Sequence, residues 1–235
     1  MRTAREIAIC ALAAALLIAV QIALSFLPGV ELVTAVFLAF CYTFGRRSGV
    51  VTATAFSLLR CFVFGFYPSV VALYLIYYNL FALLFGGLGE RNKPLPPWLA
   101  PAILLLLAAA SAALACLRLP VSILWQGRLS AMLWVMCALF AALFALNCAL
   151  LWKNKGKDYR ETAELTALAA VCTVCFTLLD DVLTPLFYRL SAEAALAWFY
   201  TSFTAMIPQT ICCVVSVSVL FLPLRKSMEF AAKKR

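Results

Sequence analysis

Residues 7–27 read IAICALAAALLIAVQIALSFL and contain no charged side chain. A helix that crosses the hydrocarbon core of a bilayer needs about 20 consecutive, mainly apolar residues. The apolar core of a secretory signal peptide is shorter, about 7–15 residues, and further apolar runs follow this one along the chain. We therefore interpret residues 7–27 as a retained transmembrane helix and not as a cleaved signal peptide.

Alanine recurs at every fourth position of this segment, at Ala11, Ala15, Ala19 and Ala23. Residues four apart lie on the same face of a helix, so these alanines would form one shallow groove. Helices associate in lipid through close packing, and small residues let two backbones approach. The groove is therefore predicted to dock another membrane protein; the alternative is that it packs against another helix of the same chain.

The composition indicates the class of protein. Hydrophobic residues make up 66% of the 235 positions and charged residues 12%, whereas a soluble domain carries about 25% charged residues. We expect an all-α integral membrane protein that forms one bundle in the lipid bilayer. The net charge is +9, but the basic residues gather in alternate short loops, which favours a multi-pass topology over nucleic-acid binding.

The same length rule predicts about eight transmembrane helices. Their approximate ranges are 7–27, 31–44, 48–66, 69–88, 98–119, 129–152, 163–187 and 194–222. The second range is short and ends at Gly45-Arg46-Arg47, and Pro94-Leu95-Pro96-Pro97 is expected to be a rigid break. Pro208 is expected to interrupt the last run, with an irregular outer segment up to about Thr204.

The distribution of basic residues predicts the orientation. If the N-terminus is cytoplasmic, 15 of the 19 lysines and arginines fall in cytoplasmic segments, and the other four are Arg60, Arg118, Arg128 and Arg189. Cytoplasmic loops of membrane proteins carry such an excess. We therefore expect a multi-pass protein of the cell membrane with both termini in the cytoplasm, and residues 227–235 as a basic cytoplasmic tail.

Residue types that carry most enzyme chemistry are absent or poorly spaced. The chain has no histidine, which removes most metal-assisted, triad and proton-relay chemistry. Cys172 and Cys175 have the spacing of a redox or metal pair, but no second pair accompanies them, so packing is the preferred interpretation. Asp180 and Asp181 are adjacent and point about 100° apart on a helix. We expect no enzymatic activity, no cofactor and no metal site.

Charged residues are predicted to gather near the outer mouth of the bundle. Arg60 lies more than a turn inside its helix, where a charge costs up to about 2.5–3.5 kcal/mol. Such charges usually face a cavity or a partner, so we expect Arg60 to pair with Glu31, Asp180 or Asp181, or to contact a substrate. Alternatively, Arg60 extends to the outer headgroups and the aspartates form a solvated helix end.

A tyrosine-rich segment is predicted to lie near these charges. Tyr74, Tyr77 and Tyr78 share a helix face, and a ring with one polar tip suits a cavity for a planar organic ligand; an interfacial aromatic belt is the alternative. Further polar residues could line the same space or simply bond between helices, namely Gln21, Thr201, Ser202, Thr204 and Gln209. The predicted substrate-binding residues are Glu31, Arg60, Tyr74, Tyr78, Asn79, Asp181 and Gln209.

Six features of the chain occur in a characteristic order: the alanine-rich first run, the stretch from Phe26 to Val33, Phe44-Gly45-Arg46-Arg47, Phe64-Gly65-Phe66, the tyrosine-rich helix, and Phe221-Leu222-Pro223-Leu224. Together they resemble the substrate-binding S components of energy-coupling factor (ECF) transporters. The resemblance covers about residues 1–90 and 161–226. Because S components usually have six helices, the resemblance implies a six-helix core at residues 1–93 and 161–226, with an inserted helical hairpin at residues 94–160.

The resemblance also implies a function and partners. S components bind vitamins or similar micronutrients near the outer face and topple in the membrane to release them inside. Small residues on their first helix dock a membrane T component that works with a pair of ATPases, a role that would fall on Ala11, Ala15, Ala19 and Ala23. Relatives often have an acidic residue near Arg60 and an Asp-x-x-His-type pair where this chain has Met206-Ile207-Pro208-Gln209, so no relative's substrate is transferred.

A ligand-free membrane scaffold, or an assembly subunit of the cell envelope, is the second hypothesis. The same alanine groove would serve such a protein. A scaffold would not need a charge at the depth of Arg60, so Arg60→Leu would leave its function intact. The two hypotheses therefore differ in whether Arg60 contacts a small molecule.

Overall fold

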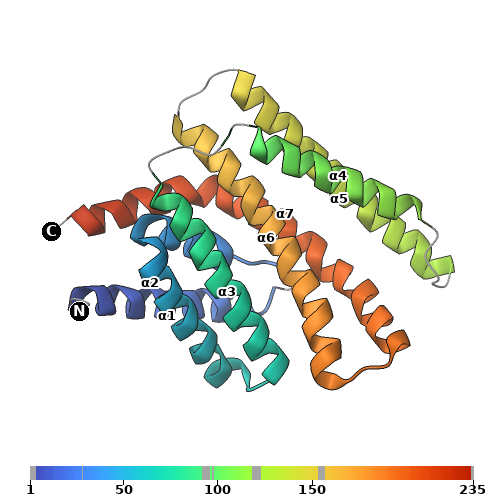
Figure 1. Ribbon diagram of the computed structural model, residues 1–235, viewed down its shortest axis with the longest axis horizontal. Coiled ribbons are helices and arrows are strands. Elements are labelled where there is room, and N and C mark those ends of the chain that lie inside the picture. The colour runs from blue at the N-terminus through green and yellow to red at the C-terminus, as the bar shows by residue number, and fades with distance from the viewer. Residues whose placement is uncertain are drawn as a thin grey trace.

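The computed structural model describes residues 4–27, 29–91, 96, 98–117, 123–152 and 157–233. This part of the chain forms seven α-helices, all long and apolar enough to cross a membrane (Figure 1). The helices are α1 (Ala4–Leu24), α2 (Val33–Phe64), α3 (Pro68–Gly89), α4 (Leu99–Cys116), α5 (Ile123–Trp152), α6 (Lys157–Tyr188) and α7 (Ala192–Lys233). The described chain is thus all-helical and has the character of a multi-pass membrane protein.

The expected count of eight helices is not confirmed, because residues 31–44 and 48–66 fall largely within one element. α2 continues through Gly45, whose φ of 80° and ψ of 178° are not helical. Glycine adopts positive φ without a Cβ clash, so both flanking segments stay helical on either side of a kink. The predicted break at residues 94–97 lies outside the described residues, apart from Pro96, and so do Arg118 and the tail residues Lys234 and Arg235.

Glu90, the residue after α3, binds the kinked part of α2. The backbone N–H of Arg46 donates to Glu90 Oε1 at 2.8 Å, and Arg46 Nε donates to Oε2 at 2.7 Å. These two donors hold the pKa of Glu90 below its usual range. The carboxylate therefore caps the second half of α2 at its N-terminal end, where the helix dipole favours negative charge.

The first helix packs only part of its surface against the bundle. Cys10, Ala14 and Leu17 are buried where α1 contacts α2. All four alanines of the predicted groove are exposed. The alternative that this groove packs against another helix of the chain is therefore wrong for the fold described here.

The last helix, α7, runs unbroken over 42 residues although Pro208 and Pro223 lie inside it. The prediction of an irregular segment up to about Thr204 is therefore wrong. A proline removes one backbone hydrogen bond, but neighbouring groups in a membrane protein can support such a position. Gly29 packs directly on Pro208, because a Cβ at Gly29 would lie 2.7 Å from Pro208 Cβ. The loop between α1 and α2 thereby lies against α7.

The helices α4 and α5 form a pair on the flank of α6 and α7, away from α1 (Figure 1). Leu104 of α4 and Met136 and Phe140 of α5 are fully buried in the hydrophobic cluster of this pair. The cluster also includes Ala167 and Ala170 of α6. The pair therefore has its own contact surface on α6 and takes no part in the contacts between α1, α2 and α3.

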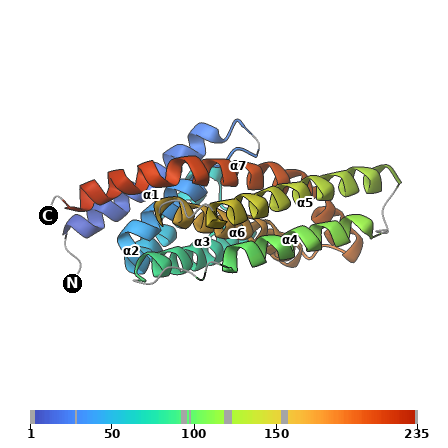
Figure 2. The same cartoon turned by 90° about the horizontal axis from the view of Figure 1, so that it is seen from above.

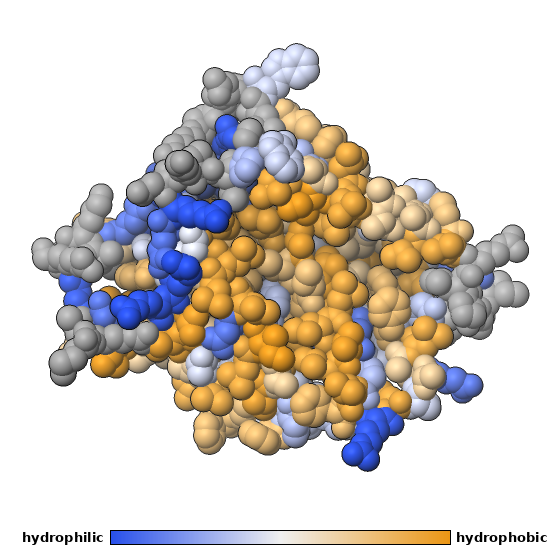
Figure 3. Space-filling model, viewed as in Figure 1, coloured by the Kyte–Doolittle hydropathy of each residue, from blue (hydrophilic) through white to orange (hydrophobic). Residues whose placement is uncertain are grey.

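The start of α1 and the end of α7 lie at the same side of the molecule (Figures 1 and 2). At this side, Arg225 of α7 contacts Glu161 of α6 at 2.7 Å and Glu229 at 2.7 Å, and its guanidinium lies over the ring of Tyr42. Hydrophobic residues cover most of the face in Figure 3, and hydrophilic residues gather toward its edges. Charges at the ends and an apolar middle are what a bilayer requires.

Candidate functional site

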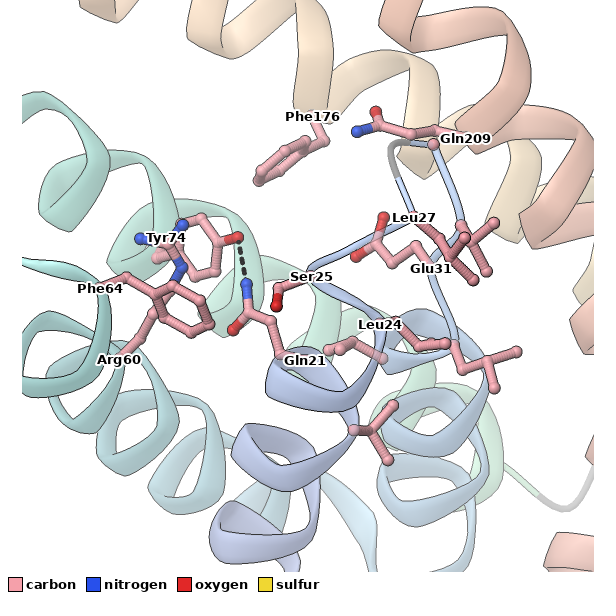
Figure 4. Close-up of a pocket in the computed structure, with 15 residues that line it drawn as sticks. Gln21, Leu24, Ser25, Leu27, Glu31, Arg60, Phe64, Tyr74, Phe176 and Gln209 are labelled. Atoms are coloured by element: carbon pink, nitrogen blue, oxygen red, sulfur yellow. Dashed lines mark hydrogen bonds between the residues drawn. The ribbon is translucent and has the colours of Figure 1, made fainter.

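A cavity of about 260 Å³ lies where the end of α1 and the loop after it meet α2, α3, α6 and α7. Pockets for drug-sized ligands measure about 300–1,000 Å³, so this cavity suits a smaller organic molecule. Figure 4 shows polar side chains from several of these elements directed toward it. The polar residues that line it are Gln21, Ser25, Glu31, Arg60, Tyr74 and Gln209.

Arg60 reaches the cavity from the last turns of α2. Its guanidinium carbon lies 4.1 Å from the ring centroid of Tyr74 and 5.2 Å from that of Phe64. A cation over an aromatic face gains about 0.5–2 kcal/mol. Its Nε is buried and has no hydrogen-bond partner among the described residues. A buried nitrogen over Tyr74 does not fit the alternative in which Arg60 extends to the headgroups.

The expected ion pair of Arg60 does not form. Within the described ranges, neither Glu31, Asp180 nor Asp181 lies within ion-pair distance of Arg60. Glu31 and Arg60 line the same cavity, but Tyr74 takes the position beside the guanidinium (Figure 4). The prediction of a carboxylate partner within the chain is therefore wrong, and contact with a substrate stays a prediction.

Gln21 and Tyr74 form the wall next to Arg60. Gln21 Nε2 donates to the Tyr74 hydroxyl at 3.0 Å, the bond dashed in Figure 4. The other end of this amide, Gln21 Oε1, is buried without a hydrogen-bond partner in the described part of the chain. A buried polar atom without a partner costs about 1–3 kcal/mol. Two buried polar atoms without a partner in the described residues, Arg60 Nε and Gln21 Oε1, therefore belong to side chains that line the cavity.

Glu31 enters the cavity from the loop before α2. The Tyr78 hydroxyl donates to Glu31 Oε1 at 3.3 Å. The Glu31 backbone is fixed to α7, because its N–H donates to Cys212 Sγ at 3.2 Å and its carbonyl accepts from the same sulfur at 3.5 Å. Burial raises the pKa of the Glu31 carboxyl above its usual range. Glu31 is thus an acidic group held at a defined position in an apolar setting.

Four of the seven predicted substrate-binding residues line the cavity, namely Glu31, Arg60, Tyr74 and Gln209. Tyr78 lies behind the wall and contacts the site through its bond to Glu31. The structure places Asn79 outside the lining, where its side chain donates to the Leu75 carbonyl at 2.7 Å and accepts from Thr54 at 3.2 Å. Asn79 therefore ties α3 to α2 and does not face the cavity.

Asp181 also lies outside the lining. Its Oδ2 accepts from the Ser202 hydroxyl at 2.8 Å, so it joins α6 to α7. Asp180 Oδ1 accepts from Thr184, one turn along the same helix. Thr201 and Thr204 donate to carbonyls of their own helix at 2.8 and 2.6 Å. The polar residues at the start of α7 therefore form hydrogen bonds within and between helices. This agrees with the alternative interpretation of Thr201, Ser202 and Thr204, in which they do not line a ligand cavity.

The tyrosines of α3 are buried. Tyr74 and Tyr77 are 8% exposed and Tyr78 is 1% exposed. They pack with Phe176 of α6, whose ring centroid is 4.8 Å from that of Tyr77 and 5.7 Å from that of Tyr74. An interfacial aromatic belt is therefore the wrong interpretation of these residues, because a belt side chain lies against lipid headgroups.

The sequence reasoning missed Ser25, Phe64 and Phe176 as lining residues. Phe64 lies four residues after Arg60, so helical spacing could have placed it on the same face. Phe176 had no comparable signal, because it comes from α6 and is one of 18 phenylalanines in the chain.

No protein-family model matches this chain, and no curated protein or solved structure matches it.

Proposed function

We propose that this protein is the membrane subunit of an importer and that it binds a small organic nutrient in the cavity between Arg60 and Glu31. The observation that carries the proposal is the Arg60 guanidinium, whose Nε is buried at the cavity without a partner among the described residues. A charge in a transmembrane helix is costly and usually marks a substrate site or pathway. A bound molecule with an acceptor group would supply the missing partner.

The resemblance to ECF S components supports the proposal that import is driven by ATP. In this proposal a T component docks on the exposed alanine face of α1, and a pair of ATPases drives import. With the two halves of α2 on either side of Gly45 counted separately, the proposed six-helix core comprises residues 1–93 and 161–226, and residues 94–160 form an inserted pair. The protein then lies in the cell membrane with both termini in the cytoplasm, and the nutrient is a vitamin or a related compound.

Mass spectrometry of small molecules released from gently purified protein tests the proposal. We expect wild-type protein from rich medium to carry about one organic compound per chain. Arg60→Ala removes a charged contact, so the affinity should fall at least about tenfold, a loss of roughly 1.4 kcal/mol in binding, and the retained amount should fall with it. Arg128→Ala is the matched control, because Arg128 is an exposed residue of α5 and does not line the cavity.

Two results would count against the proposal. Equal retention of the compound by wild type, Arg60→Ala and Tyr78→Ala would place the binding site elsewhere. A wild-type protein that stays empty after growth in rich medium and after exposure to vitamins would favour a ligand-free scaffold. Thermal unfolding of each variant separates loss of binding from loss of the fold.

A further inference from the structure

The cavity presents opposite charges from two different elements. Arg60 comes from the end of α2 and Glu31 from the loop before α2, and Figure 4 shows them on different sides of the space. We infer that the occupant is amphoteric, with a carboxylate at Arg60, an ammonium group at Glu31 and an apolar group against the apolar part of the lining. This inference rests on the proposed function and names the chemical class of the nutrient.

The Arg60 side of the cavity favours a carboxylate. A guanidinium offers several N–H donors in one plane, a geometry that matches two carboxylate oxygens. Tyr74 covers one face of the guanidinium, so its edge is the part left for a ligand. No carboxylate of the described chain occupies that position. A ligand carboxylate would thus meet both a charge and the unpartnered Nε.

The Glu31 side of the cavity favours a cationic donor. A purely anionic ligand that reached Arg60 would lie in the same cavity as the Glu31 carboxyl, and like charges repel strongly where water is scarce. In the same way, Arg60 would repel a purely cationic ligand that bound at Glu31. An amphoteric molecule satisfies both residues and adds no net charge to the site. Gln21 and Gln209 can then bond its remaining polar atoms.

Apolar side chains form another part of the lining. Leu24 of α1, Phe64 of α2 and Phe176 of α6 belong to this part of the lining. The volume of about 260 Å³ leaves room for one small apolar group beside the two charged groups. The simplest probe with this pattern is an α-amino acid with one aromatic ring, and L-phenylalanine has the required groups.

Three probes of matched shape test the inference on stripped wild-type protein. L-Phenylalanine carries both charges, 3-phenylpropanoate lacks the ammonium, and 2-phenylethylamine lacks the carboxylate. Isothermal titration at up to about 10 mM ligand covers dissociation constants in the millimolar range. We expect each single-charge probe to bind at least about tenfold more weakly than L-phenylalanine, because it leaves one charged residue of the cavity unpaired.

Two variants identify the residue that binds each charged group of the ligand. In Arg60→Gln, L-phenylalanine and 2-phenylethylamine should bind about equally, because the carboxylate has lost its partner. In Glu31→Gln, L-phenylalanine and 3-phenylpropanoate should bind about equally. Arg128→Gln, at an exposed position of α5, should keep the wild-type order of the three probes.

The pH dependence gives a separate readout. Charged and titratable groups near Glu31 are Arg60 on α2, Tyr74, Tyr77 and Tyr78 on α3, and Cys212 and Cys213 on α7. Burial raises the pKa of Glu31, and an ammonium group binds the ionised carboxylate. Binding of L-phenylalanine should therefore strengthen as pH rises through this pKa, and Glu31→Gln should abolish that change.

The inference is overturned if either single-charge probe binds wild type as tightly as L-phenylalanine, or if none of the three binds. Its failure can be told apart from failure of the proposed function. If wild-type protein releases one bound compound that is neutral or carries a single charge, import of a nutrient stands and the amphoteric class is wrong. If no compound is released and no probe binds, both fail.

Discussion

Gly86 of α3 sets how closely two backbones approach at the kink of α2. A Cβ at Gly86 would lie 2.6 Å from the Arg46 nitrogen and 2.8 Å from the Gly45 carbonyl carbon, which are backbone atoms. Its neighbour Gly87 faces the flexible Arg46 side chain, with its nearest atom at 3.4 Å. The two glycines therefore differ in whether a methyl group can be accommodated.

This difference predicts the stability of two alanine variants. Both Gly86→Ala and Gly87→Ala gain about 1 kcal/mol of helix propensity, but only Gly86→Ala must push α2 away from α3. Overpacking costs about 1–3 kcal/mol, so Gly86→Ala should be less stable than Gly87→Ala by about that amount. Thermal or denaturant unfolding in detergent measures the difference. Equal stability of the two variants would show that the helices do not cross as closely as described.

At the scale of single residues, the sequence indicated which side chains were unusual but not which atoms they meet. Arg60 was predicted to be in contact with a carboxylate because a buried charge needs compensation. In the structure Tyr74 stacks on the guanidinium instead. Asn79 and Asp181 are polar residues in apolar helices, as expected for a site, yet they bond to Leu75 and Ser202. Spacing along one helix gives the face of a residue, and the rotation of each neighbouring helix decides its partner.

At the scale of elements, the alanine face of α1 carries the proposed contact with a T component. The four alanines are exposed, and α1 is buried only along its other face. Small residues allow close helix contact in lipid. This face therefore stays a predicted docking surface. The alternative, that it packs against another helix of the same chain, does not fit the described fold.

Bulky substitutions on this face should block assembly. We expect Ala15→Leu together with Ala19→Leu to reduce the ATPase subunits that copurify with the tagged protein from native membranes at least about tenfold. Ala109→Leu is the control, because Ala109 is an exposed alanine of α4. Quantitative mass spectrometry of the purified complexes gives the ratio. Undiminished ATPase recovery with the double variant would rule out this face as the docking surface.

The elements themselves were predicted unevenly. The sequence predicted that a helix ends at Gly45-Arg46-Arg47, because these residues interrupt an apolar run, whereas the structure has a kink there. Whether the chain would turn through a loop or through a kinked helix was not visible, since this depends on Glu90, the residue after α3, binding Arg46. Pro208 suggested an interruption that does not occur, because packing of α7 supports a continuous helix around it.

At the scale of the whole molecule, composition alone predicted the class of fold. A chain with 66% hydrophobic residues satisfies its backbone in lipid by forming helices. The cavity was harder to predict from the sequence, because residues of α1, α2, α3, α6, α7 and a loop line it together. Glu31 and Gln209 line the same cavity, and near them the loop at Gly29 packs on Pro208. A contact across so much chain depends on tertiary packing and leaves no local pattern.

A crystal structure of protein purified gently from cells grown in rich medium tests the central claim most directly. We predict electron density for one small organic molecule in the cavity, with an acceptor group at the Arg60 guanidinium and further contacts to Gln21 and Glu31. Density for such a molecule elsewhere in the bundle, or a cavity that contains only water or a lipid chain, would contradict the claim that this site binds the transported nutrient.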